Sequence, residues 1–141
     1  MTAPAFFDTN VLVYLFANDE PDKQQAAERL YVERCEDGSA VVSTQVLQEF
    51  FSVATAVMKK VVQAGTGRLA VQEFAMHHCV QVTPALVLKA IDRSEADQLA
   101  IWDALIVESA LAGGCRTLYS EDFQHERAFG PLRVVNPFLP A

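Results

Sequence analysis

Short apolar runs alternate along the chain with longer stretches in which apolar residues recur every three or four positions. The runs have the length of strands, and the longer stretches have the spacing of helices that bury one face. The predicted strands are residues 5–7, 40–42, 80–82, 117–119 and 133–135, with the last at the edge of a sheet. This alternation predicts a mostly parallel central sheet covered on both faces, a three-layer α/β/α sandwich.

Helix starts and stops in the sequence set the bounds of the helical stretches. The predicted helices cover about residues 21–36, 44–65, 68–78, 84–94 and 99–112, and residues 11–16 form a further apolar segment. Ser43 or Thr44 caps the second helix, which we expect to end near Gly65 and Gly67, since glycine favours helix ends. The last helix is nearly all apolar and ends at Gly113.

Length and composition indicate one compact domain. The chain has 141 residues, of which 51% are hydrophobic and 21% charged, which excludes a disordered protein. We therefore expect residues 1–141 to form a single domain. No stretch approaches the roughly 20 apolar residues of a spanning helix, and the N-terminus lacks the basic start of a signal peptide. The expected location is the cytoplasm, without membrane association.

The cysteines and the adjacent histidines do not indicate a metal site. Cys35, Cys79 and Cys115 are far apart and odd in number, so buried reduced thiols are expected rather than disulfides or a thiolate zinc site. His77 and His78 fall at the end of a predicted helix. Consecutive helical side chains point about 100° apart and rarely share one ion.

The net charge excludes one class of function. Eleven basic residues stand against 18 acidic ones, a formal net charge of −7, which is the wrong sign for a general nucleic-acid binder. The negative charge is weaker evidence against a nuclease, because carboxylates that hold cations add negative charge that the metal cancels.

Four acidic residues occur where their side chains can converge. Asp8 and Asp122 each follow a predicted strand, and ligands of an open parallel sheet bind beyond the carboxyl ends of its strands. Glu49 and Asp103 lie on or beside apolar helix faces, where an unpaired carboxylate is costly. A hard divalent cation relieves the repulsion among such groups. These four acids are the candidate site, around one or two divalent cations.

Each of these acids also has an ordinary structural explanation. Asp103 could pair with an arginine such as Arg116. Asp8 and Asp122 could merely cap turns, and Glu49 could be solvated at a helix edge. Four such explanations are needed at once, which makes the joint explanation the weaker one.

The acids stand in motifs that resemble those of a known family. FFDTNVLVY, STQVLQEF, WDALIVESAL and TLYSEDF follow the order of the acidic motifs of PIN-domain nucleases, over almost the whole chain. The similarity is closest to the VapC-type toxins of bacterial toxin–antitoxin pairs. It implies a PIN-like α/β/α fold and endoribonuclease activity that depends on Mg²⁺ or Mn²⁺ and hydrolyses RNA by a metal-activated water. It also implies a cognate antitoxin and a homodimer.

The resemblance also implies roles for individual residues. Asp8 and Asp103 would be direct metal ligands, and Glu49 and Asp122 would complete the metal site directly or through water. The adjacent polar residues that could orient ligands or water are Thr9, Asn10 and Ser120.

Further charged residues near the motifs allow either a functional or a structural interpretation. Asp97 and Glu121 could add to the potential of the site or be solvated, and Lys59, Lys60 and Arg68 could form a basic rim for RNA phosphates or a solvated helix end. Two positions depart from the family pattern without removing an acid. Ala100 replaces a frequent capping serine, and Glu108 interrupts the apolar run after WDALIV. Because Glu108 is about 140° around the helix from Asp103, we expect a surface or interface charge there.

Two other functions share some of these features with a nuclease. A phosphotransfer protein, either a receiver domain or a haloacid-dehalogenase-like phosphatase, also uses an aspartate after its first strand. The phosphatase needs a second aspartate where this chain has Asn10, and neither class explains Glu49 with Asp103. A catalytically inactive PIN-like module that binds RNA or protein is the other alternative, and retention of all four acids argues against it.

Overall fold

The computed structural model describes residues 2–56 and 61–140. The helices are α1 (Thr9–Tyr14), α2 (Pro21–Glu36), α3 (Thr44–Ala54), α4 (Ala64–Phe74), α5 (Pro84–Asp97) and α6 (Ile101–Ala112). The strands are β1 (Ala5–Phe7), β2 (Ala40–Ser43), β3 (His78–Val80), β4 (Thr117–Tyr119), β5 (Ala128–Phe129) and β6 (Leu132–Val135). No helix among the described residues is long and apolar enough to cross a membrane.

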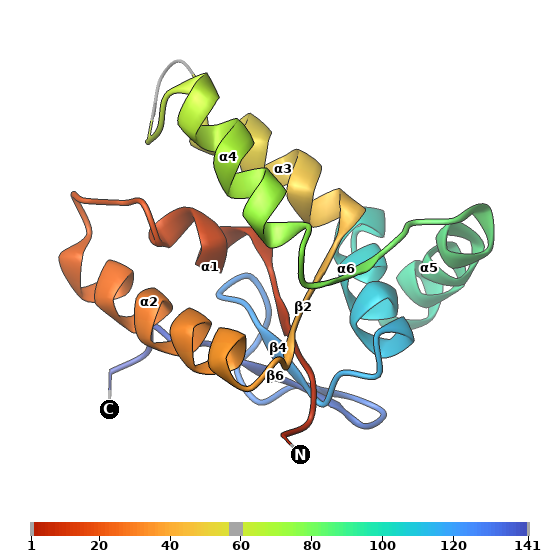
Figure 1. Cartoon of the computed structure of the whole chain (residues 1–141). Coiled ribbons are helices and arrows are strands. Elements are labelled where there is room, and N and C mark those ends of the chain that lie inside the picture. The colour runs from red at the N-terminus through yellow and green to blue at the C-terminus, as the bar shows by residue number, and fades with distance from the viewer. Residues whose placement is uncertain (1, 57–60, 141) are drawn as a thin grey trace.

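The strands form one sheet in the order β3-β2-β1-β4-β6-β5, in which β5 alone is antiparallel to its neighbour. Figure 1 shows α2 on one side of the strands and α5 and α6 on the other, so the predicted α/β/α sandwich is confirmed. From β1 the chain first adds β2 and β3 on one side and then returns to add β4 on the other. The strand order therefore reverses between β1 and β4, the position where open sheets of this kind bind ligands.

The central strands are apolar on both faces because helices cover both. All three residues of β1 are fully buried, and Phe6 lies opposite Val41 of β2 and Leu118 of β4 in the parallel register. Such continuous apolar strands are typical of a covered parallel sheet. This core fixes the carboxyl ends of β1 and β4 side by side, where Asp8 and Ser120 follow.

The predicted end of the second long helix was wrong. Ser43 caps α3 through its Oγ, as one of the two predicted options, but α3 ends at Ala54, and Gly65 and Gly67 lie inside α4. The backbone N–H groups of Val61 and Val62 both donate to the carbonyl of Ala54, which turns the chain back. A Cβ on Gly67 would lie 3.1 Å from Thr55 Cγ2, so this glycine permits α3 and α4 to pack closely.

Two predicted strands were also misplaced. The third strand covers His78–Val80 rather than 80–82, because α4 ends at Phe74 and the chain pairs with β2 earlier than expected. The last strand is not at the edge of the sheet. Gly130, with φ +59°, allows a tight turn that adds the two-residue β5 outside β6. A strand of two residues leaves too little pattern to detect.

The cysteines are free, as predicted, but only Cys115 is buried, whereas Cys35 and Cys79 are half-buried. The two adjacent histidines do not share a helix. His78 begins β3. The Nε2 atom of His77 lies 2.7 Å from the hydroxyl of Tyr31 on α2. His77 is thus accounted for by packing between α2 and α4.

Candidate active site

Asp8 stands at the junction of β1 and α1 and serves as the N-cap of that helix. Its Oδ1 accepts a hydrogen bond from the backbone N–H of Thr9 at 2.8 Å, and its Oδ2 accepts one from Ser120 Oγ at 2.7 Å. The backbone N–H of Asp8 donates to the carbonyl of Tyr119 in β4. Two hydrogen bonds to the carboxylate and one from the backbone N–H therefore fix Asp8, which is only 5% exposed.

Burial makes the negative charge of Asp8 costly. It raises the pKa of this carboxyl from its ordinary value to about 7. The hydrogen bonds from Ser120 and Thr9 only partly oppose this shift, and the nearby charges of Asp122 and Glu49 add to it. A buried carboxylate without a nearby positive charge is electrostatically unfavourable, and a bound cation would stabilise its charged form.

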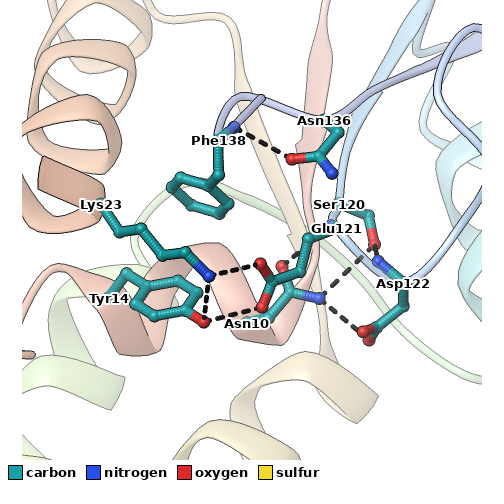
Figure 2. Close-up of polar contacts among 8 residues, drawn as sticks. All are labelled: Asn10, Tyr14, Lys23, Ser120, Glu121, Asp122, Asn136 and Phe138. Carbon is teal, nitrogen blue, oxygen red and sulfur yellow. Dashed lines mark hydrogen bonds and ion pairs between the residues drawn. The ribbon is translucent and has the colours of Figure 1, made fainter. Parts of the chain in front are cut away.

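Asp122 lies in the loop that follows β4 and is held by polar side chains of α1 and of its own loop (Figure 2). Asn10 Nδ2 donates to Asp122 Oδ2 at 2.9 Å, and the backbone N–H of Asp122 donates to Ser120 Oγ at 3.1 Å. Ser120 thus contacts both Asp8 and the loop that carries Asp122. Of the adjacent polar residues predicted to orient ligands, Asn10 and Ser120 are in position to do so.

Glu49 projects from α3 toward the same place. It lies one turn after Gln45, on the edge of the buried face, and its Oε1 accepts a hydrogen bond from Thr9 Oγ1 at 3.4 Å. Burial raises the pKa of Glu49, and the charges of Asp103 and Asp122 raise it further. Thr9 therefore contacts a predicted ligand, as Asn10 and Ser120 do.

Asp103 stands in the first turn of α6, where the positive end of the helix dipole favours an acid. Burial and the charge of Asp122 both raise its pKa. Asp103 is absent from the ion pairs found among residues 2–56 and 61–140. Arg116 precedes β4 and so lies at the opposite end of that strand from Asp122. The alternative in which Asp103 pairs with Arg116 is wrong.

All four acids line one cleft of about 880 Å³. Their mutual effects on pKa show that they act on one another electrostatically. The carboxylates do not already form a closed cage, because within the described ranges no three acidic, histidine or cysteine side chains are grouped as a metal site. Oxygen donors around an open cleft fit a hard cation that keeps several of its waters.

Sequence reasoning missed several residues that line this cleft. Tyr14, Gln45 and Trp102 belong to the lining, and so do the apolar side chains of Phe16 and Val53. For Trp102, its position next to Asp103 in the sequence was the feature that could have placed it at the cleft. Gln45 precedes Glu49 by one helical turn, which places both on the same face of α3.

A second polar network supports the loop after β4 and accounts for Glu121 (Figure 2). Glu121 accepts a hydrogen bond from the Tyr14 hydroxyl at 2.8 Å and pairs with Lys23 Nζ at 3.2 Å. The Lys23 ammonium also lies over the rings of Tyr14 and Phe138. The charge of Glu121 is therefore compensated locally by α1 and α2.

The remaining charged candidates lie elsewhere. Asp97 pairs with Arg93 at 2.8 Å, and Glu108 pairs with the same guanidinium, which joins α5 to α6 away from the cleft. Arg68 is exposed on α4 and does not line the cleft, and Lys59 and Lys60 lie outside the described residues. Ala100 precedes α6 without a side-chain cap, as its sequence predicts.

The four acidic motifs thus meet at the strand-order reversal of an α/β/α fold, and comparison with known families identifies the fold. The model of the PIN domain matches residues 5–129. The chain belongs to the PIN-domain family. Among solved structures it resembles the crystal structure of Mycobacterium tuberculosis VapC20, described as a sarcin–ricin loop cleaving toxin. The TM-score is 0.66 at 20% sequence identity, over 85% of this chain and 91% of that one. Comparison with curated protein sequences gave no match.

Proposed function

We propose that this PIN-domain protein is a metal-dependent endoribonuclease and the toxin of a toxin–antitoxin pair. The observation that carries the proposal is the convergence of four carboxylates, from β1, α3, α6 and the loop after β4, on one cleft. Family membership supports nuclease activity. The likeness in fold to VapC20, itself described as a sarcin–ricin loop cleaving toxin, supports RNA as substrate and a cognate antitoxin as partner.

The residues present fit a divalent cation. Asp8 and Asp103 would ligate it, with Glu49 and Asp122 contributing directly or through water. Asp8 has both carboxylate oxygens fixed by donors, so its orientation is set before a cation arrives. Prearranged donors of this kind are typical of metal sites, where outer contacts hold the ligands. Mg²⁺ and Mn²⁺ both suit an all-oxygen donor set.

The chain's own residues bind and orient the reacting groups. When bound, the cation supplies an activated water and neutralises charge that develops on the phosphate. Ser120 holds Asp8, and Asn10 holds Asp122, so the acids keep their positions while the phosphate enters. The burial of Asp8 keeps bulk water away from one side of the site, which strengthens charge interactions there.

The products of cleavage test the proposal. Cleavage through the RNA's own 2′-hydroxyl requires a general base and acid, often two histidines, and leaves a cyclic phosphate. None of the three histidines lines the cleft: His77 contacts Tyr31, His78 begins β3, and the ring of His125 accepts from the backbone of Asn136. Mass spectrometry of a defined RNA should therefore show 5′-phosphate and 3′-hydroxyl ends.

Two variants complete this experiment. Asp8→Asn and Asp103→Asn should each lower the cleavage rate by at least about 100-fold, because loss of a direct metal ligand reduces activity more than loss of an outer contact does. Asp97→Asn, an acid outside the cleft, is the control and should cleave normally. A 2′,3′-cyclic phosphate product would refute hydrolysis by a metal-activated water. Normal cleavage by both Asp8→Asn and Asp103→Asn would refute the site.

A further inference from the structure

Trp102 is a large aromatic side chain that remains 65% exposed beside the acidic cleft. It belongs to the lining of the cleft and immediately precedes Asp103 in the first turn of α6. The Cα atoms of consecutive residues are about 3.8 Å apart, so the indole originates next to a proposed metal ligand. An exposed aromatic ring of this size at the edge of a cleft offers a flat surface on which a bound molecule can stack.

The position of Trp102 is fixed by a contact between two helices. Gln45 on α3 donates a hydrogen bond from Nε2 to the carbonyl oxygen of Trp102 on α6, at 3.2 Å. Gln45 is 5% exposed and also lines the cleft. The contact couples the start of α6 to the turn of α3 that carries Glu49.

Gln45 also has an unused acceptor. Its Oε1 is buried and has no hydrogen-bond partner among the described residues. Leaving a buried acceptor unpaired is unfavourable, and a donor from a molecule bound in the cleft would satisfy it. The wall next to Trp102 therefore combines an exposed aromatic face with an acceptor suited to an N–H or O–H group.

The charges of the cleft indicate which kind of group binds there. The described residues that line it include six acids and neither lysine nor arginine. These described residues do not themselves attract phosphates, so a bound cation and uncharged parts of the substrate are the groups that they favour. Bases offer such parts, since each has a flat face that stacks on aromatic side chains whatever the sequence.

We propose that Trp102 stacks on an unpaired base next to the scissile phosphate, with Gln45 as the residue that positions it. The inference rests on the proposed ribonuclease function and adds a residue that positions the substrate: Trp102 would bind the base of a nucleotide next to the scissile phosphate. A phosphate held near Asp103 places the base of an adjoining nucleotide within reach of the indole. Trp102 thereby sets where the strand lies in the cleft.

The experiment uses the intrinsic fluorescence of the protein, because Trp102 is its only tryptophan. Short single-stranded RNA of mixed sequence is titrated into the full chain in Ca²⁺, which binds oxygen ligands but is less suited to catalysis. We expect saturable quenching by this RNA. An oligonucleotide of the same length with abasic riboses should not quench.

Affinity measurements on three variants complete the test. Trp102→Ala should bind the RNA about 5- to 150-fold more weakly, the range expected for one stacked base, and should raise KM more than it lowers kcat. Trp102→Phe should recover part of the loss. Leu88→Ala is the matched control, since Leu88 is 63% exposed on α5 and outside the cleft, and its affinity should not change.

The outcomes separate this inference from the function on which it rests. Equal RNA affinity of wild type and Trp102→Ala, without quenching, would overturn the inference while cleavage still supports the function. A lower molecular mass of Trp102→Ala by light scattering, with RNA affinity unchanged, would assign Trp102 to a contact between copies and also overturn it. No RNA binding by the wild type would overturn both.

Discussion

The carboxylate of Asp8 performs two tasks whose electrostatic requirements differ. As the N-cap of α1 it accepts hydrogen bonds from Thr9 and Ser120, which favour its charged form. As a buried group it favours the neutral form, and burial dominates, because the pKa is raised to about 7. At neutral pH the metal-free protein therefore holds a carboxyl close to half-protonation, and a cation would complete its ionisation.

The stability of the metal-free protein should consequently depend on pH in a defined direction. Between the ordinary pKa of 3.8 and about 7, the folded state binds more protons at Asp8 than the unfolded state does. Folding stability therefore falls as pH rises through this window, by at most about 1.4 kcal/mol per pH unit.

The variant Asp8→Asn tests this dependence, because the amide does not titrate. In EDTA, its melting temperature should exceed that of the wild type at pH 8, and the difference should shrink at pH 5. Thermal denaturation followed by circular dichroism measures both. A difference that is the same at the two pH values would show that the Asp8 charge is not the cause.

At the scale of elements, the loop after β4 is held by the first two helices. Asn10 and Tyr14 of α1 and Lys23 of α2 contact Asp122 and Glu121 (Figure 2). Glu121 lies directly between Ser120 and Asp122 in the chain, so its ion pair restrains the backbone that carries a proposed ligand. The function of this network is positional, since its own charges are already paired.

Removal of the positive charge of Lys23 from this network should reduce activity more than stability. Lys23→Met keeps much of the apolar contact with Tyr14 and Phe138 but loses the ion pair to Glu121. The pair is partly exposed, so we expect less than about 1 kcal/mol of destabilisation. Cleavage should slow by roughly 10-fold, the lower range for loss of a contact that orients a ligand.

Arg93→Met is the control for Lys23→Met, because Arg93 joins Asp97 and Glu108 on α5 and α6 outside the cleft. It should lower the melting temperature and leave the cleavage rate per folded molecule unchanged. Chemical denaturation and initial rates distinguish the two variants. Equal rates for Lys23→Met and wild type would show that the loop holds its position without the ion pair.

At the scale of the whole molecule, cation binding and folding are linked. A ligand bound only by the native state stabilises it, by about 2.7 kcal/mol at a concentration 100 times its dissociation constant. Saturating Mg²⁺ or Mn²⁺ should thus raise the melting temperature of the wild type on the order of 10 °C. Asp8→Asn should shift much less, whereas Asp97→Asn should shift like the wild type. Equal shifts in all three would place the cations elsewhere.

The molecule also leaves apolar side chains exposed, which bears on its assembly. Leu69 of α4 is 67% exposed, Leu88 of α5 is 63% exposed, and Met76 is 86% exposed. Together with the family resemblance, this surface leads us to expect a homodimer. Light scattering at micromolar concentration, without antitoxin, should give twice the chain mass of 15.5 kDa. A monomeric mass would contradict this expectation.

The sequence by itself determined the fold class, the positions of β1 and β4, and the four acids. Apolar runs, helical spacing and acids that follow strands are local properties, so one chain is enough to read them. The same local rules failed where packing between elements decides the bounds of a helix. Gly67 looked like a helix stop, but it lies inside α4, where a Cβ would come within 3.1 Å of Thr55 and 3.4 Å of Phe51 on the neighbouring helix α3 and its cap.

Only the tertiary structure decided how charges pair and which residues surround the cleft. Asp97 and Glu121 were indistinguishable from site acids until Arg93 and Lys23 were found beside them. Tyr14 and Trp102 line the cleft only because α1 and α6 meet at the reversal of strand order. The contacts of Glu121 with Tyr14 and Lys23 join residues about a hundred positions apart, so no local pattern encodes them, whereas the Arg93–Asp97 pair spans one helical turn. Burial is likewise a property of the folded chain, which is why the raised pKa of Asp8 emerged only there.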